Sequence, residues 1–461
     1  MSGLQHHLRL GGFHHECRGR TAIVTHSDRP PAVITRAPAH CVKGFWLAAT
    51  TRRADVISLT ILILTIVAGA WDLLIDPVRA GLDTLTFFWP TYAFLGDQLR
   101  SGNVPGWNPY QFSGVPFAAD PESGWMYVPA MLIFSLLPLA AALKVYAVAH
   151  ILIAGCGTYF YGRIIGLVPA GALVSAWAVS QGGLFSDRSR CCYTHIQVAA
   201  WIPIALLGVE LAVRAVRHRQ RMLAWLLTGF AISQMLSGWI GQGAMYGLMF
   251  TGAYVFFRTA VHPPTSEGPV GTRFVQAARH GLIPLVFGAG FAAPGMLPRF
   301  AYYGESNLAE GYSGSAAWAA QVGGWTFGRQ LELLFHPSGW FFLGATVIAL
   351  GFVAIFHPWN RHYVVFFLLL TAAGFTLGLE QHTALHRLLF AILPGFEDLH
   401  THFPERVAIV LPFGPAMLAG IGMTNLLRDP SSRTLLIASL TVGIGAFSMR
   451  AIRLGFTLQS W

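Results

Sequence analysis

Four carboxylates, Asp83, Asp97, Asp120 and Glu122, stand in one stretch, residues 83–129, that interrupts a series of apolar segments. Side chains of this type can accept a proton from a hydroxyl group or ligate a divalent metal, and in a loop they can also simply be solvated. The stretch also holds eleven aromatic residues between many prolines and glycines. Its prolines argue against long regular elements, and its aromatic side chains need a membrane interface or a cleft to pack against. We therefore expect an ordered, acidic, aromatic-rich loop outside the membrane.

A second group of residues able to do chemistry consists of histidines. His382 and His386 are spaced four apart, and His400 and His402 follow two acids. Such spacing could supply imidazole ligands for zinc or manganese. Neither pair has a clear third ligand on a defined helix, so the sequence favours solvated loop histidines.

The composition indicates the class of protein in which these residues are positioned. The chain has 461 residues, of which 54% are hydrophobic and 11% are charged, whereas soluble domains carry about 25% charged residues. We expect a polytopic membrane protein. The net charge of +10 is explained by arginines on the cytoplasmic side, so no nucleic acid is expected as a partner. The adjacent Cys191 and Cys192 are interpreted as an incidental pair.

The fold class predicted from the apolar segments is an all-α polytopic membrane protein with about eleven transmembrane helices (range about 10–13). Two further segments, residues 127–139 and 384–394, are predicted to lie at the interface. The predicted spans are 55–75, 143–162, 169–185, 197–213, 222–238, 242–257, 281–297, 340–356, 363–379, 407–426 and 434–449.

The distribution of charge gives these spans a direction. Arg52 and Arg53 precede the first span, and four arginines fall within residues 214–221, so both places are predicted to be cytoplasmic. The acids then fall mostly on the outer side. The resulting regions are a basic, His-rich cytoplasmic tail at 1–54, a membrane domain at 55–450 with outer loops at 76–142, 298–339 and 380–406, and a short tail at 451–461.

The chain lacks the sequence motifs of several classes of enzyme and nucleotide-binding protein. It has no Walker A loop, no HExxH, no GxSxG and no Rossmann fingerprint after a strand. An ATP-driven transporter is therefore excluded. A secondary transporter should place ionisable groups within the membrane, and the predicted spans contain almost none.

Several segments, in order, resemble a known family. Asp83 is followed by FFWP and then by LRSGNVPGWNPYQFSGVPFAADP, and this pattern resembles the first loop of the YfhO-like bacterial membrane proteins. That family is grouped with the GT-C superfamily of polyprenyl-phosphate-sugar-dependent glycosyltransferases. Further likeness lies in the region after His195, in GWIGQGAMYG, in LPRFAYYGES and in PERVAIVLPFGPAMLAGIG. The resemblance covers residues 55–430, although members of the family usually run well beyond this length.

The resemblance implies roles for particular residues. Asp83 matches the acid that acts as general base on an acceptor hydroxyl, although it could also mark only the polar end of a span. Asp120 and Glu122 would bind the acceptor sugar or a divalent metal. Arg299 and Arg406 would bind the leaving phosphate or serve as interfacial anchors. The matching motifs supply the remaining candidate substrate-binding residues, which are Trp107, Asn108, Tyr110, His195 and Gln242.

The resemblance also implies partners and a location. The expected donor is a polyprenyl-phosphate sugar, and the expected acceptor is a cell-envelope glycopolymer, a lipid or a protein. The reaction would occur at the outer face of a bacterial cytoplasmic membrane, with the N-terminus inside. No cofactor is required by the sequence, and a divalent metal stays an open alternative. Two other functions stay open, a transporter or flippase of a lipid-linked precursor and an inactive truncated relative.

Overall fold

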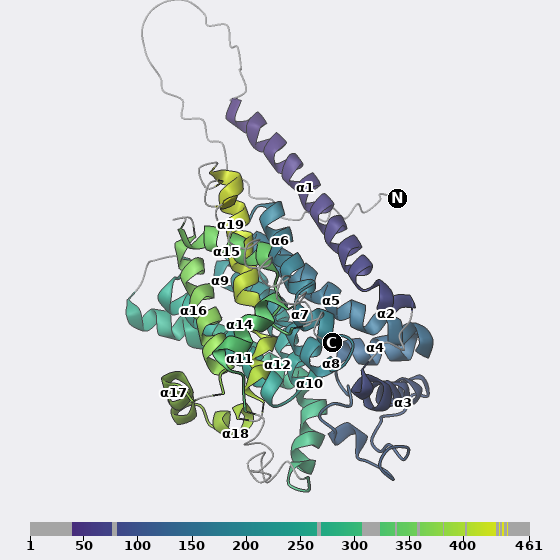
Figure 1. Ribbon diagram of the computed structural model, residues 1–461. Coiled ribbons are helices and arrows are strands. Elements are labelled where there is room, and N and C mark those ends of the chain that lie inside the picture. Colours follow the sequence, from purple (N-terminus) through teal and green to yellow (C-terminus); the bar gives the residue numbers. More distant parts are fainter. Residues whose placement is uncertain are drawn as a thin grey trace, which may run out of the picture. The chain divides into compact units, whose positions relative to one another are not determined.

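The described part of the chain is helical. The β pairing among these residues consists of two isolated bridges, Asn108 with Val115 and Trp325 with Leu379. The chain divides into two units, residues 1–49 and 50–461, and the account below concerns the second (Figure 1). Most of the predicted tails, parts of the loops predicted at 76–142 and 298–339, His402, and most of the span predicted at 434–449 lie outside the described residues. The computed structural model describes residues 39–75, 81–264, 269–306, 323–336, 339–356, 360–380, 382–401 and 403–429, with 433, 436, 437 and 440.

Within this part, four helical stretches are long and apolar enough to cross a membrane. They are Leu139–Ile164, Tyr193–Arg214, Val270–Tyr303 and Pro404–Arg428. Three shorter apolar helices accompany them, Pro169–Ser180, Ala345–Phe356 and Arg361–Leu377. The described residues therefore form a helical fold with four candidate membrane-spanning stretches, and the count of about eleven spans stays a prediction.

The helix bounds follow the apolar segments of the sequence closely. The two segments predicted to be interfacial also form short helices, α4 and α17. The first half contains α1 (Ala39–Gly69), α2 (Trp71–Ile75), η2 (Thr84–Phe88), α3 (Trp89–Arg100), η3 (Phe117–Ala119), α4 (Val128–Leu136), α5 (Leu139–Ile164), α6 (Pro169–Ser180), α7 (Gly183–Arg188), α8 (Tyr193–Ala199), α9 (Ile202–Arg214) and α10 (His218–Gly238). The second half contains α11 (Gln242–Phe256), η4 (Phe257–Val261), α12 (Val270–Tyr303), α14 (Phe327–Phe335), α15 (Ala345–Phe356), α16 (Arg361–Leu377), α17 (Ala384–Ile392), α18 (Phe396–His400), η7 (Pro404–Ile409) and α19 (Phe413–Arg428).

The first loop differs from its prediction at its start. The expectation that its prolines exclude long regular elements is wrong there, because η2 and α3 run on from each other over residues 84–100. Pro90 lies in the first turn of α3. Because η2 precedes α3 without a break, Pro90 stands where the π-helical turn passes into the α-helix, and that turn already departs from the regular i→i−4 bonds that a proline cannot make. The rest of the stretch, residues 101–127, is mainly turns, as its prolines and glycines predict.

The second difference concerns α12. The sequence predicts a span that ends at residue 297, before Pro298, and a loop from residue 298 onward. Instead, the helix continues to Tyr303 and contains Pro284, Pro294 and Pro298 in its interior. Membrane helices tolerate such prolines because neighbouring groups can satisfy the freed carbonyls. Arg299 therefore lies on a helix and not in a loop.

Close helix contacts at glycine hold the C-terminal helices together. Figure 1 shows α15 and α19, the green and yellow helices, side by side, and they are in contact. A Cβ atom at Gly422 of α19 would lie 1.9 Å from the backbone oxygen of Leu350 in α15. A Cβ at Gly420 would lie 1.9 Å from Ser175 Oγ in α6. Small residues that let backbones approach in this way are typical of helix packing in membranes.

A buried ion cluster joins three helical segments near the arginine-rich end of α9. Glu210 is fully buried and pairs with both Arg214 and Arg258. Tyr254 and Tyr363 also donate hydrogen bonds to this carboxylate. Because α9, α11 with η4, and α16 each contribute a member, the cluster fixes their mutual positions. It is an exception to the expectation that the spans contain almost no ionisable groups.

Candidate functional site

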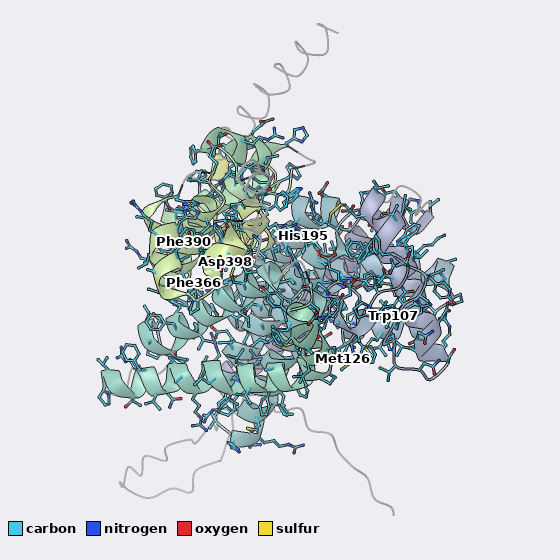
Figure 2. The ribbon with its side chains drawn as sticks, turned by 90° about the horizontal axis from the view of Figure 1, so that it is seen from below. Trp107, Met126, His195, Phe366, Phe390 and Asp398 are labelled. Atoms are coloured by element: carbon cyan, nitrogen blue, oxygen red, sulfur yellow. A yellow bond between two sulfur atoms is a disulfide. The ribbon has the colours of Figure 1, made fainter. Side chains whose placement is uncertain are left out.

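A cavity of about 230 Å³ brings together residues from five segments of the chain. Four of its lining residues, Asp83, Glu122, His195 and Arg406, are candidates named by the sequence. Figure 2 shows the labelled His195 well inside the molecule. The other lining residues are Phe87, Phe88, Cys192, Thr194 and Trp239.

Asp83 is held at this cavity by backbone contacts to a distant segment. It immediately precedes η2, and its side chain is exposed. On one side, the Gly81 N–H donates to the Arg190 carbonyl at 2.6 Å. On the other, the Thr84 hydroxyl lies 2.9 Å from the Arg190 carbonyl and 2.5 Å from that of Cys191. The carboxylate therefore keeps a fixed place while remaining accessible to a substrate.

The wall beside Asp83 is a disulfide. Cys191 and Cys192 are bonded to each other, so the interpretation of an incidental pair is wrong. Each sulfur lies 3.8 Å from Asp83 Oδ2. Bonded sulfurs carry no proton, so these are packing contacts and not hydrogen bonds. These three residues are the one group of the described residues with spacing suited to a metal, but a disulfide does not offer two thiolate ligands.

Glu122 supplies the second carboxyl group of the cavity. Burial, and after it the negative charge of Asp120, raise the pKa of Glu122 from 4.5 to about 7, against a lowering effect of Arg406. The Glu122 N–H donates to Asp120 Oδ1 at 2.7 Å, so the two acids form one tight turn. Burial also raises the pKa of Asp120. Glu122 can therefore hold or release a proton near neutral pH.

Arg406 brings positive charge to the cavity. It lies in η7, and its guanidinium carbon is 5.1 Å from the centre of the Trp239 ring. Its Nη1 donates to Gln242 Oε1 at 3.1 Å, and the Gln242 amide donates in turn to the Phe403 carbonyl at 3.1 Å. Gln242 is buried and does not line the cavity. Its contacts can therefore fix the position of the Arg406 side chain.

His195 is a buried imidazole between two indole rings. Its ring centre is 4.9 Å from that of Trp239 and 5.6 Å from that of Trp340. Its Nε2 atom has no hydrogen-bond partner among the described residues. A buried polar atom without a partner is costly unless a ligand or water satisfies it. His195 is therefore suited to bind a polar group inside the cavity.

Arg188 is the functional candidate that the sequence reasoning missed. Its guanidinium carbon is 3.4 Å from the centre of the Trp340 ring, and its Nη1 is 3.1 Å from Cys192 Sγ in the cavity wall. Burial lowers the pKa of Arg188 to about 10, which leaves it charged at neutral pH. In the sequence it follows Asp187, with which it pairs, so the two look like a neutral surface pair.

Three candidates from the first loop lie elsewhere. Asn108 is buried and stabilises the loop, because it pairs with Val115 and its Nδ2 donates to Gln111 Oε1 at 2.9 Å. Trp107 and Tyr110 point away from the core, with 58% and 84% of their surface exposed. In Figure 2 the labelled Trp107 is well apart from His195. None of the three lines the cavity.

Arg299 is also not a lining residue. Its guanidinium donates to the backbone carbonyls of Ser237 at 3.2 Å and of Trp125 at 3.3 Å. It therefore joins α12 to the end of α10 and to the first loop. Its positive charge acts on both Asp120 and Glu122, so it influences the cavity from behind the wall.

The histidines do not form the expected solvated group. His386 and His400 are fully buried, and their ring centres are 5.0 Å apart. His400 Nδ1 is 2.7 Å from the Tyr246 hydroxyl, and His386 Nε2 is 3.2 Å from the Leu377 carbonyl. The interpretation as solvated loop histidines is therefore wrong for this pair. Their ligand atoms are also not among those with metal spacing in the described residues.

Comparisons with known proteins add little to this picture. No model of a known protein family matches the chain, and no curated protein matches it. One similar solved structure is the crystal structure of the Archaeoglobus fulgidus oligosaccharyltransferase in complex with Zn and sulfate. It has 12% sequence identity and a TM-score of 0.41 over 84% of this chain, and this chain spans 51% of its length. At that level the likeness decides nothing about activity.

Proposed function

We propose that this chain is a membrane glycosyltransferase that transfers a sugar from a polyprenyl-phosphate donor to a cell-surface polymer, lipid or protein. The observation that supports the proposal is the cavity, in which Asp83 and Glu122 face the same space as Arg406 and His195. An acid that accepts a proton and a cation that stabilises a leaving phosphate are the groups this transfer needs. The resemblance to the YfhO-like family suggests the lipid-linked donor.

Each residue then has a role in the transfer. The acceptor hydroxyl gives its proton to the exposed carboxylate of Asp83, and its oxygen forms a bond to the anomeric carbon of the donor sugar. The bond from that carbon to the phosphate oxygen breaks, and the polyprenyl phosphate leaves with the electron pair. Arg406, which lines the cavity, stabilises the negative charge that develops on it, and Arg188 adds its positive charge from behind the disulfide wall. Glu122 and His195 bind hydroxyl groups of the sugars.

The test is Asp83→Asn, which keeps the size of the side chain but cannot accept the proton. Sugar transfer should fall by about 10²–10⁴-fold in membranes supplied with the lipid-linked donor. Donor binding should persist. Asp97→Asn is the matched control, because Asp97 lies on α3 in the same stretch of the chain, is exposed, and forms an ion pair with the nearby Arg100. Transfer at the wild-type rate by Asp83→Asn would exclude Asp83 as the base.

A chain that moves the lipid-linked precursor without chemistry gives a different pattern. In that case purified wild-type protein would form no transferred product with any donor tested, but it would still change the side of the membrane on which the donor is found. An assay that follows both product and donor orientation in vesicles therefore separates the two functions.

A further inference from the structure

A second cavity shares no lining residue with the candidate site. It has a volume of about 310 Å³ and lies between α10, α11 and α12. Its wall is apolar in effect, because the hydroxyls of Thr228 and Thr251 donate to carbonyls of their own helices at 3.0 and 2.8 Å. Only 22% of the apolar window of α12 is buried, so this helix presents most of its surface outward. The cavity is a groove in a surface suited to lipid.

Basic side chains lie beside one end of this groove, although Arg221 and Arg279 do not themselves line it. His280 lines the groove, and the Trp225 indole N–H donates to His280 Nδ1 at 3.0 Å. The guanidinium carbon of Arg279 is 5.0 Å from the Trp225 ring centre. Arg221 lies one turn before Trp225 on α10. Its Nη2 donates to the Ala215 carbonyl at 2.7 Å, and its buried Nε has no hydrogen-bond partner among the described residues. In the sequence, Glu267 is the one acid between Arg214 and His280.

The tautomer of His280 gives this end of the groove a hydrogen-bond donor. An indole N–H can only donate, so His280 Nδ1 must be the acceptor and the proton of the neutral ring is on Nε2. No group among the described residues accepts from that Nε2. The basic end therefore presents two guanidinium groups and one imidazole donor beside an apolar groove.

We infer that the groove binds an anionic phospholipid. The phosphate of its headgroup would lie beside Arg221, Arg279 and His280, and one acyl chain would occupy the groove. Charge complementarity argues for this occupant, since basic pockets between membrane helices bind anionic headgroups. The apolar groove gains packing contacts when a chain fills it, whereas an empty void forfeits them. The site is independent of the proposed glycosyl transfer.

The experiment measures lipid bound to the purified full-length protein by native mass spectrometry, with equal amounts of phosphatidylglycerol and phosphatidylcholine. Wild type should retain phosphatidylglycerol in preference. The double variant Arg221→Gln, Arg279→Gln should lose about 30-fold of that preference, given the attraction of two arginines for an anionic headgroup. Its matched control is Arg217→Gln, Arg219→Gln, which removes two exposed charges at the start of α10.

A second variant tests the groove itself. A Cβ atom at Gly252 would meet nothing within 4 Å, and Gly252 lines the groove, so Gly252→Leu should fold and fill it. Binding of phosphatidylglycerol should then fall about 10-fold. Gly290→Leu is the control, because Gly290 has equally open space on α12 and does not line the groove.

Three results would overturn the inference. The first is equal retention of the two phospholipids by wild type. The second is wild-type preference in the double arginine variant, or wild-type binding in Gly252→Leu with an unchanged melting temperature. The third is preferential retention of an added polyprenyl phosphate over phosphatidylglycerol, which would assign the groove to a different lipid.

Discussion

Replacing Glu122 should change how the stability of the protein depends on pH. The pKa of Glu122 is about 7 in the folded state, against an ordinary value of 4.5. The folded state therefore binds this proton more tightly than the unfolded state does. The free energy of unfolding must then fall as the pH rises between those two values. Below about pH 4 and above about pH 8 this group adds no further pH dependence, and above about pH 8 the loss of stability is complete. Glu122→Gln cannot ionise and removes the decline.

The size of the effect follows from the shift. A rise from 4.5 to about 7 corresponds to about 3 kcal/mol if the group is fully shielded from water. Glu122 lines a cavity, and part of its surface is exposed to solvent. Solvent screening therefore reduces the expected gain in the free energy of unfolding to about 1–2 kcal/mol. Glu122→Gln should therefore be more stable than wild type at about pH 8 and equally stable at about pH 4.

Thermal unfolding of the purified protein in one detergent, measured at intervals from about pH 4 to about pH 8, tests this expectation. A difference of 1 kcal/mol shifts the melting temperature of a protein this large by about 2 °C. The difference between variant and wild type should grow across this range. Glu305→Gln, at an exposed glutamate just after α12, is the matched control. A difference that does not vary with pH, or that favours wild type at high pH, would refute the reasoning.

Four further variants, one of them with a control, test other contacts. Gly183→Ala should lower the melting temperature sharply, because its Cβ would lie 1.7 Å from a facing carbonyl oxygen; circular dichroism on heating measures this. Arg258→Gln should cost about 3–5 kcal/mol, since it leaves a fully buried glutamate without its main partner. Arg214→Gln should cost about 1 kcal/mol, because that side chain is 39% exposed against 4% for Arg258; denaturation in detergent compares the two. Arg188→Gln should weaken binding of the lipid-linked donor by about 10-fold, and Arg190→Gln should not, as direct binding measurements would show.

The helices could be predicted well from the sequence where they are continuous and apolar. The span predicted at 143–162 corresponds to α5, Leu139–Ile164, and the cluster at 214–221 marks the turn between α9 and α10. Errors occur at prolines. From the sequence we expect no long regular element around Pro90 and a span that ends before Pro298, but Pro90 lies where η2 passes into α3 and Pro298 lies inside α12.

The candidate site depends on contacts that no local pattern contains. The position of Asp83 depends on hydrogen bonds that its neighbour Thr84 makes to the backbone carbonyls of Arg190 and Cys191, which are more than a hundred residues away in the chain. Periodicity and charge describe single elements, so they could indicate which side of the membrane an acid faces but not which cysteine or arginine would face it. Arg188 was missed for this reason. Its role depends on Trp340, a residue that stands far away in the sequence.

Aromatic composition is a poor guide to which loop residues reach a site. The motif around Trp107 and Tyr110 is the most distinctive part of the first loop, yet both side chains are exposed and Asn108 serves to close the turn. Glu122, with no motif of its own, lines the cavity because η3 and the turn at Asp120 bring the chain back toward α8. A distinctive motif can thus specify the shape of a loop, while the residue of the same stretch that lines the cavity belongs to no motif. Substitutions at Trp107 or Tyr110 should therefore affect activity less than those at Glu122.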